Sequence, residues 1–187
     1  MTWMLTATGR KVHPAALEPQ DICAQDIAHH LAKICRFTGA CRIHWSVAEH
    51  SMLVADILTA KYPTNYTLQL CGLLHDAPEA YLQDLATPVK MQLEVYHAME
   101  RAAWWAVAEH FGLPAQLPPE VKHADLVALA TEKRDLMPVH PEPWSVLDGI
   151  PPVAYEIGAV ETHWRLTAAK FMHYLADLRG RVANPLH

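Results

Sequence analysis

The chain lacks the sequence features of secreted and membrane proteins. Its four cysteines form no C-x-x-C pair, and no apolar segment near the N-terminus has the character of a signal peptide. A run of about 18 apolar residues, which a membrane-spanning helix requires, is also missing. We therefore expect a cytoplasmic protein with reduced thiols and without a membrane partner.

An excess of positive charge is missing as well. The chain has 15 basic and 20 acidic residues, a formal charge of −5 and an isoelectric point near 6.2. Polymeric nucleic acids require a broad basic field, which this composition does not supply. We therefore expect no polymeric nucleic-acid partner, whereas a small phosphorylated ligand needs only a few local cations.

Sustained alternation of apolar and polar residues, internal repeats and low-complexity tracts are absent too. Apolar residues instead recur with the helical period, and prolines and glycines separate these segments. A length of 187 residues and an apolar fraction of 51% suffice for one well-buried domain. We predict an all-α, single-domain bundle with helices over residues 21–37, 46–61, 65–81, 89–111, 119–137 and 160–181, and an irregular surface segment or lid over residues 138–152.

The most informative residues present are His75 and Asp76, in the stretch LLHDAPE at residues 73–79. An isolated His50 precedes this pair, and an isolated Asp125 follows it. Two imidazoles and two carboxylates are enough donors for one divalent metal ion, with coordination positions left for water. The sequence therefore predicts a metal site that is open to substrate.

The phase of two helices predicts that the isolated residues face the interior. Residues Ser46 and Glu49 have the spacing of a capping box, which fixes where the helix begins. At about 100° per residue, His50 falls among apolar residues of the following turns, and Asp125 shares an apolar stripe with Glu132. A desolvated carboxylate costs several kcal/mol unless it has a partner, so Asp125 needs one.

Each of these residues also has an ordinary structural interpretation. Asp125 can pair with Arg36 or Lys90, and His50 can be a hydrogen-bonded core histidine, because most of the 13 histidines cannot be ligands. A shared metal ion explains one inward histidine, one inward aspartate and a His-Asp pair at a helix end together. We therefore favour the metal site.

In these residues the chain resembles the HD-domain metal-dependent phosphohydrolases, and more narrowly the small bacterial and phage members that include the 5′-deoxynucleotidases. The resemblance starts at Arg36-Phe37, passes through SVAEHS at residues 46–51 and HDAPEAYLQDLATPVK at residues 75–90, and ends near Asp125. It implies an HD-type helical domain over residues 31–187, preceded by an arm and the start of the first helix over residues 1–30. It also implies the metal ligands His50, His75, Asp76 and Asp125.

The resemblance further implies that Glu79 transfers protons and that Arg36, with its aromatic neighbour Phe37, meets the substrate. The residue chemistry suits these roles, because Glu79 lies one helical turn beyond His75 and the guanidinium of Arg36 can grip two phosphate oxygens. We place Asp84 with Glu79 among the catalytic residues and Lys90 with Arg36 as a second substrate-binding cation. Their structural alternatives are a surface or helix-terminal charge for Glu79, Arg36 and Lys90, a core aromatic for Phe37 and a turn cap for Asp84.

The implied activity is hydrolysis of the 5′-phosphate of deoxynucleotides, with a monophosphate favoured and manganese, cobalt, iron, zinc or magnesium as the cofactor. The arm, the short interval between His50 and His75, and the proline-rich residues 138–152 depart from the nucleotidase pattern. The metal assignment therefore transfers more safely than the nucleotide. A deoxynucleoside triphosphate triphosphohydrolase that releases triphosphate, such as the dATP-specific phage type, is the main alternative.

Three other functions are weaker. Two E-x-x-H pairs, at residues 94–97 and 120–123, are typical of di-iron carboxylate oxidoreductases, although Glu120 and His123 lie opposite the Asp125 stripe. A non-catalytic nucleotide sensor is disfavoured because every ligand and Glu79 are retained. A zinc site at Cys35, Cys41 and His44 lacks a fourth ligand. Related enzymes commonly form homo-oligomers, which an outward-facing Trp105 permits.

Overall fold

The computed structural model describes residues 3–184, and it is all-α apart from one small hairpin. The two strands, β1 (Met4–Leu5) and β2 (Lys11–Val12), pair antiparallel. The α-helices are α1 (Ala24–Leu31), α2 (Val47–Lys61), α3 (Tyr66–Leu74), α4 (Glu79–Leu82), α5 (Thr87–Lys90), α6 (Glu94–Phe111), α7 (Pro119–Leu136) and α8 (Trp164–Ala183). Short 3-10 helices are η1 (Pro14–Ala16), η2 (Pro19–Asp21), η3 (Arg36–Gly39) and η4 (Ser145–Leu147). None of the described helices has the length and apolar character of a membrane-spanning segment.

The first predicted helix was too long, because the structure ends α1 at Leu31. Cys35 is extended instead, and residues 34–36 bond to residues 45–47, with the Arg36 amide donating to the Trp45 carbonyl at 2.8 Å. Within η3, Phe37 and Thr38 adopt left-handed backbone with φ of 54° each, so a right-handed α-helix cannot continue through them. We call residues 34–36 the strap, and its bonds to residues 45–47 fix the position from which the Arg36 side chain projects.

Two further predicted helices are interrupted. Residues 65–81 form α3 and α4 with a tight turn between them, in which the Ala77 amide donates to the Leu74 carbonyl at 2.9 Å. Pro78 explains the break, because proline disfavours helical backbone in the residue before it. Residues 89–111 begin instead with the separate α5 and continue as α6 from Glu94. The first break places His75 and Asp76 in a turn and not inside a helix.

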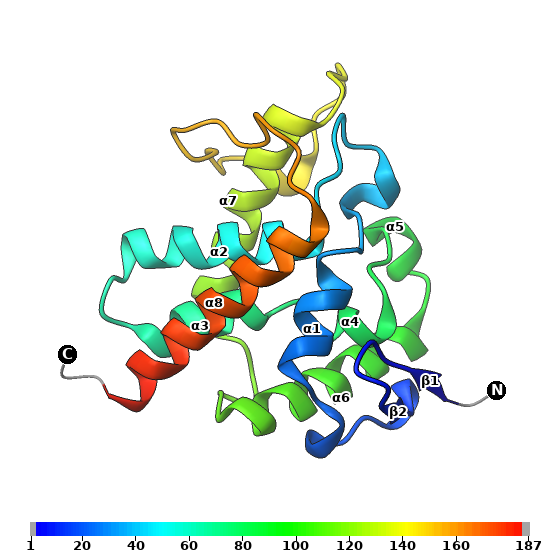
Figure 1. Ribbon diagram of the computed structural model, residues 1–187. Coiled ribbons are helices and arrows are strands. Elements are labelled where there is room, and N and C mark those ends of the chain that lie inside the picture. Colours follow the sequence, from blue (N-terminus) through cyan, green and yellow to red (C-terminus); the bar gives the residue numbers. More distant parts are fainter. Residues whose placement is uncertain (1–2, 185–187) are drawn as a thin grey trace.

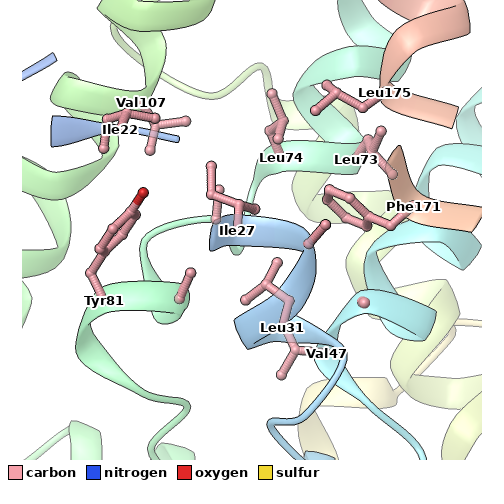
Figure 2. Close-up of a cluster of buried hydrophobic side chains, with 14 of the residues drawn as sticks. Ile22, Ile27, Leu31, Val47, Leu73, Leu74, Tyr81, Val107, Phe171 and Leu175 are labelled. Atoms are coloured by element: carbon pink, nitrogen blue, oxygen red, sulfur yellow. The ribbon is translucent and has the colours of Figure 1, made fainter. Parts of the chain in front are cut away.

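The arrangement of the helices follows from their apolar faces. In Figure 1, α2 and α3 form an antiparallel pair, α8 crosses both, and α7 rises past α2. A large core lies between α1, α3, α6 and α8, where Figure 2 shows Ile27, Leu73 and Phe171 close together. A second cluster joins α2, α3 and α7. The two cores hold rigid the three elements that carry the predicted metal ligands.

The N-terminal arm contains the hairpin, which the sequence pattern did not predict. Asp26 of α1 is fully buried and accepts two hydrogen bonds from Thr8, at 2.8 Å from the amide and 2.7 Å from the hydroxyl. His30 accepts a hydrogen bond from the Ala7 amide and its other ring nitrogen lies 2.7 Å from the Ala80 carbonyl oxygen. The arm therefore packs onto α1 and, through His30, onto α4.

Candidate metal centre

His50 lies in the first turn of α2, and the predicted capping box fixes this turn. The Ser46 hydroxyl accepts from the Glu49 amide at 3.2 Å, and the Glu49 carboxylate accepts from the Ser46 amide at 2.9 Å. His50 is fully buried, as the helix phase predicted. Its Nδ1 lies 2.8 Å from Glu132 Oε1, so that Nε2 is the nitrogen that faces the other candidate ligands.

His75 and Asp76 occupy the turn between α3 and α4. The Nδ1 of His75 lies 2.8 Å from the Gly72 carbonyl, which can only accept, so this nitrogen carries the proton. The other ring nitrogen, Nε2, then faces Asp76 Oδ2 at 3.2 Å. Local backbone thus orients His75 Nε2 toward the Asp76 carboxylate.

Asp125 comes from the second turn of α7 and joins the cluster through His50. Its Oδ1 lies 3.2 Å from His50 Nε2, and its Oδ2 accepts from the Lys122 ammonium at 2.8 Å. Lys122 is largely exposed and leaves Oδ1 free of a cation. The alternative partners considered for Asp125, Arg36 and Lys90, are bound to other carboxylates.

The donor set fits a divalent cation. Ligand atoms of His50, His75 and Asp76 all lie within 4.8 Å of one another, whereas Asp125, the fourth predicted ligand, is not part of this group and approaches it at His50, at 3.2 Å. The His50 Nε2 lies 3.6 Å from Asp76 Oδ2 and is buried without a hydrogen-bond partner among the described residues. Two ligands at right angles around a cation at about 2.1 Å lie about 3.0 Å apart, close to these separations. A buried imidazole nitrogen between two carboxylates is the arrangement that a metal ion satisfies.

The electrostatics of the cluster favour ionised carboxylates. Burial opposes ionisation of Asp76, but the adjacent His75 and His50 outweigh it and hold the pKa of Asp76 below its ordinary range. Burial likewise opposes ionisation of Asp125, and contact with His50 lowers its pKa well below the usual value. Both carboxylates are therefore anionic donors at neutral pH.

Glu132 is the functional residue that sequence reasoning left without a role. It is fully buried on α7, where Oε1 accepts from the Trp45 indole at 2.8 Å and faces His50 Nδ1, and Oε2 accepts from the Arg36 guanidinium at 2.9 Å. Burial raises the pKa of Glu132, but the Arg36 and His50 charges bring it down to about 2. A carboxylate behind a ligating histidine fixes the ring and raises its basicity. The signal in the sequence that could have indicated Glu132 is its position on the same inward-facing stripe as Asp125.

Arg36 and Phe37 lie next to the contacts of Glu132, because the strap between α1 and α2 places them there. One Arg36 nitrogen is held by Glu132, while its Nε is buried without an acceptor among residues 3–184. The Arg36 guanidinium lies 5.1 Å from the Phe37 ring centroid, and Phe37 lies 6.0 Å from the Trp144 ring. Trp144 belongs to the predicted lid, residues 138–152, which therefore reaches the Arg36 side of the centre.

Glu79, on the first turn of α4, is buried three residues beyond Asp76. Its Oε1 lies 3.7 Å from Lys90 Nζ, and its Oε2 is buried without a partner in the described part of the chain. Burial, reinforced by Asp76 and Asp84, raises the pKa of Glu79 well above its ordinary value. Burial raises the pKa of Asp84 as well, against the effect of Arg36. Glu79 can therefore hold a proton at a pH where a free glutamate is ionised.

Lys90 is held by acidic residues on both sides. Its ammonium donates to Glu100 Oε1 at 2.7 Å in addition to its contact with Glu79, and His97 Nδ1 lies 3.3 Å from the other Glu100 oxygen. Its role as a second substrate-binding cation stays a prediction. In the structure its contacts are with protein carboxylates.

A pocket of about 500 Å³ opens directly on the centre. Of the predicted site residues, His75, Asp76 and Glu79 line it, whereas His50, Asp125, Arg36, Phe37, Asp84 and Lys90 do not. Pro78, at the start of α4, completes this side of the pocket. The remaining walls come from α6 and from the loop before α7, which sequence reasoning did not connect with the site: Glu100, Arg101, Trp104, Ala115, Gln116 and Leu117.

The alternative metal sites gain no support from the described residues. Glu120 and His123 line a separate pocket of about 250 Å³ beside α2, and Glu94 is exposed at the start of α6. Cys41 contacts the sulfur of Met137 at 3.9 Å, and no cluster of potential ligands in residues 3–184 includes Cys35, Cys41 or His44. Trp105 is 47% exposed, as predicted, while its neighbour Trp104 is buried.

Comparison with known proteins finds relatives of similar length. A protein of Escherichia coli (strain K12), named "Uncharacterized protein YfdR", is 38% identical over 151 residues, which cover 81% of this chain and 82% of the relative. A protein of Rhodobacter capsulatus, named "Uncharacterized protein RCAP_rcc00048", is 39% identical over 126 residues, or 65% of this chain and 64% of that protein. No protein-family model matches the chain.

Proposed function

The chain belongs to the same family as YfdR of Escherichia coli, and we propose that it is a metal-dependent phosphohydrolase of the HD type. The proposed reaction removes the 5′-phosphate of deoxynucleotides, with monophosphates as the favoured substrates. The resemblance of residues 36–125 to HD-domain phosphohydrolases supports this proposal, and the geometry of the centre supports it independently.

One observation carries the proposal. The buried His50 Nε2 has no hydrogen-bond partner in the described residues, yet it lies between the carboxylates of Asp76 and Asp125, with His75 beside them. Three separate elements supply these groups. A purely structural histidine would have its second nitrogen satisfied when fully buried.

The residues that would hold the ion are His50, His75, Asp76 and Asp125. When bound, a divalent cation polarises a phosphoryl oxygen and lowers the pKa of a water molecule toward neutrality. Glu132 holds the Nδ1 proton of His50, so Nε2 is the nitrogen that would coordinate the ion, after losing the proton that a pKa raised to about 9 otherwise keeps on the ring. The Gly72 carbonyl holds the Nδ1 proton of His75 in the same way.

Glu79 and Arg36 would perform the remaining steps. Lys90 occupies the Oε1 side of Glu79, so the proton is held on Oε2. As water attacks phosphorus, the bond to the 5′-oxygen breaks and this oxygen takes the proton of Glu79. A proton from the attacking water then returns to Glu79, and the products are inorganic phosphate and the deoxynucleoside. The side of the Arg36 guanidinium that Glu132 does not hold would bind a phosphate oxygen.

The experiment is a screen of deoxynucleoside mono-, di- and triphosphates against manganese, cobalt, iron, zinc and magnesium. We expect release of inorganic phosphate from monophosphates, lost in Asp76→Asn and retained in Asp177→Asn, which changes an exposed aspartate of α8. Release of triphosphate would show the triphosphohydrolase alternative instead. Nucleotide binding without any turnover would make the protein a sensor and refute the proposed activity.

A further inference from the structure

The pocket beside the metal centre is lined by residues that can bind a part of the substrate other than its phosphate. Its walls lead from His75, Asp76 and Glu79 to α6 and the loop between α6 and α7. A volume of about 500 Å³ is within the usual range of pockets that bind small ligands. The pocket therefore has room for the part of a substrate that lies beyond the scissile phosphate.

Arg101 is the lining residue that stands out by its charge. It is exposed, and it makes no hydrogen bond, ion pair or ring contact with any described residue. The other cations of the region are already bound, Arg36 to Glu132 and Lys90 to Glu100. Arg101 is therefore free to bind a ligand in this pocket.

Away from Asp76 and Glu79, the side chains of the pocket that are free to bind a ligand are the donors Arg101 and Trp104 and the amide of Gln116, which can donate or accept. Both oxygens of the lining Glu100 are engaged, one by Lys90 and the other by His97. Trp104 also lines the pocket, and its indole N–H is buried without an acceptor in the described part of the chain. A guanidinium and an indole can donate hydrogen bonds but cannot accept them. A ligand suited to this pocket must present acceptors.

We propose that this pocket binds the base of the leaving deoxynucleoside. The base would be a planar ring whose edge presents two adjacent hydrogen-bond acceptors, and Arg101 would donate to both. The proposal rests on the proposed function, because it names the substrate class of the same site. The planar fork of arginine matches an edge with a carbonyl oxygen beside an unprotonated ring nitrogen, as guanine presents.

The lining favours a ring over a chain of phosphates. Pro78, Trp104 and Leu117 give the pocket apolar walls, against which the faces of a ring can pack. A polyphosphate would bring several negative charges next to the carboxylates of Asp76 and Glu100, and the pocket offers Arg101 alone as an unpaired arginine or lysine among the described residues. Like charges brought together in this way disfavour binding.

The test compares two substrates and one ligand without phosphate. For Arg101→Ala, we expect the loss in kcat/KM for deoxyguanosine 5′-monophosphate to exceed the loss for deoxyribose 5-phosphate by about tenfold or more, the usual discrimination of a bidentate arginine. Binding of deoxyguanosine to protein without added metal, followed by calorimetry, should weaken by a similar factor. Trp104→Phe, which keeps the ring but not the N–H, should weaken deoxyguanosine binding as well. Arg181→Ala, an exposed arginine of α8, should match the wild type throughout.

The outcomes separate this inference from the proposed function. Equal losses for both substrates would assign Arg101 to the phosphate and overturn the ring proposal. Deoxyguanosine binding that is absent, or unchanged in Arg101→Ala, would overturn it too. If the wild type hydrolyses neither ester with any metal, the phosphohydrolase proposal fails, and the calorimetry still decides whether the pocket binds the ring.

Discussion

Replacement of Glu132 by glutamine tests the buried network behind the metal centre. The amide keeps an acceptor oxygen for Trp45 and His50 but removes the negative charge that faces Arg36 at 2.9 Å. Because Glu132 is fully buried, water cannot replace the lost interaction. Loss of one partner from a buried ion pair typically costs about 3–5 kcal/mol.

The pKa of Glu132 gives a second estimate of the stability that this charge contributes. In the folded protein it is about 2, against an ordinary value of 4.5. A difference of this size corresponds to about 3 kcal/mol of stability, at about 1.4 kcal/mol per pKa unit. Since the folded-state pKa is the lower one, this stability is fully present above pH 4.5 and is lost as the pH falls toward 2.

The assay is urea denaturation of both proteins in a metal chelator, so that metal binding does not contribute to stability. We expect Glu132→Gln to be less stable by about 3 kcal/mol at pH 7 and the difference to shrink below pH 4.5. The double variant with Arg36→Met should recover part of the loss, because no charge is then left unpaired. We expect a loss within about 0.5 kcal/mol for the control Glu109→Gln, which changes an exposed residue. A loss as small as this in Glu132→Gln at pH 7 would show that the buried charge of Glu132 does not stabilise the fold.

Three other variants examine the neighbourhood of the centre. Glu79→Gln should bind metal as the wild type does but lower kcat by about 10²–10⁴-fold, and equal rates would remove Glu79 from proton transfer. Lys90→Met removes a charge that lowers the pKa of Glu79, so the pH–rate limb of Glu79 should move to higher pH, whereas Lys90→Arg should leave it near the wild-type position. A downward shift in Lys90→Met would contradict this sign. Thr8→Val should cost about 1–3 kcal/mol in urea denaturation, because the buried Asp26 loses the hydroxyl donor, and an unchanged midpoint would show that this hydroxyl contributes nothing to stability.

The sequence predicted the helical fold and where His50 lies, for local reasons. The Ser46–Glu49 capping box depends on residues three apart, so the start of α2 and the inward phase of His50 follow without tertiary information. The break at Pro78 also had a local signal, but the helical period of residues 65–81 masked it. Strands of two residues, as in the N-terminal hairpin, are too short for any periodic pattern.

The missed residues depend on contacts between distant segments. Glu132 lies 96 positions from Arg36, and only packing of α7 against α2 and the strap brings them together. Arg101 lies on the exposed side of α6, where a charged residue predicts solvent, and it lines the pocket because this part of α6 lies across from the turn that holds His75. No spacing in the sequence encodes either relation.

A crystal structure of the protein grown with manganese, with anomalous scattering used to locate the ion, tests the proposed metal centre. We expect one peak within about 2.4 Å of His50 Nε2, His75 Nε2 and carboxylate oxygens of Asp76 and Asp125. A peak elsewhere, or no peak among these four residues, would show that they do not form a metal site.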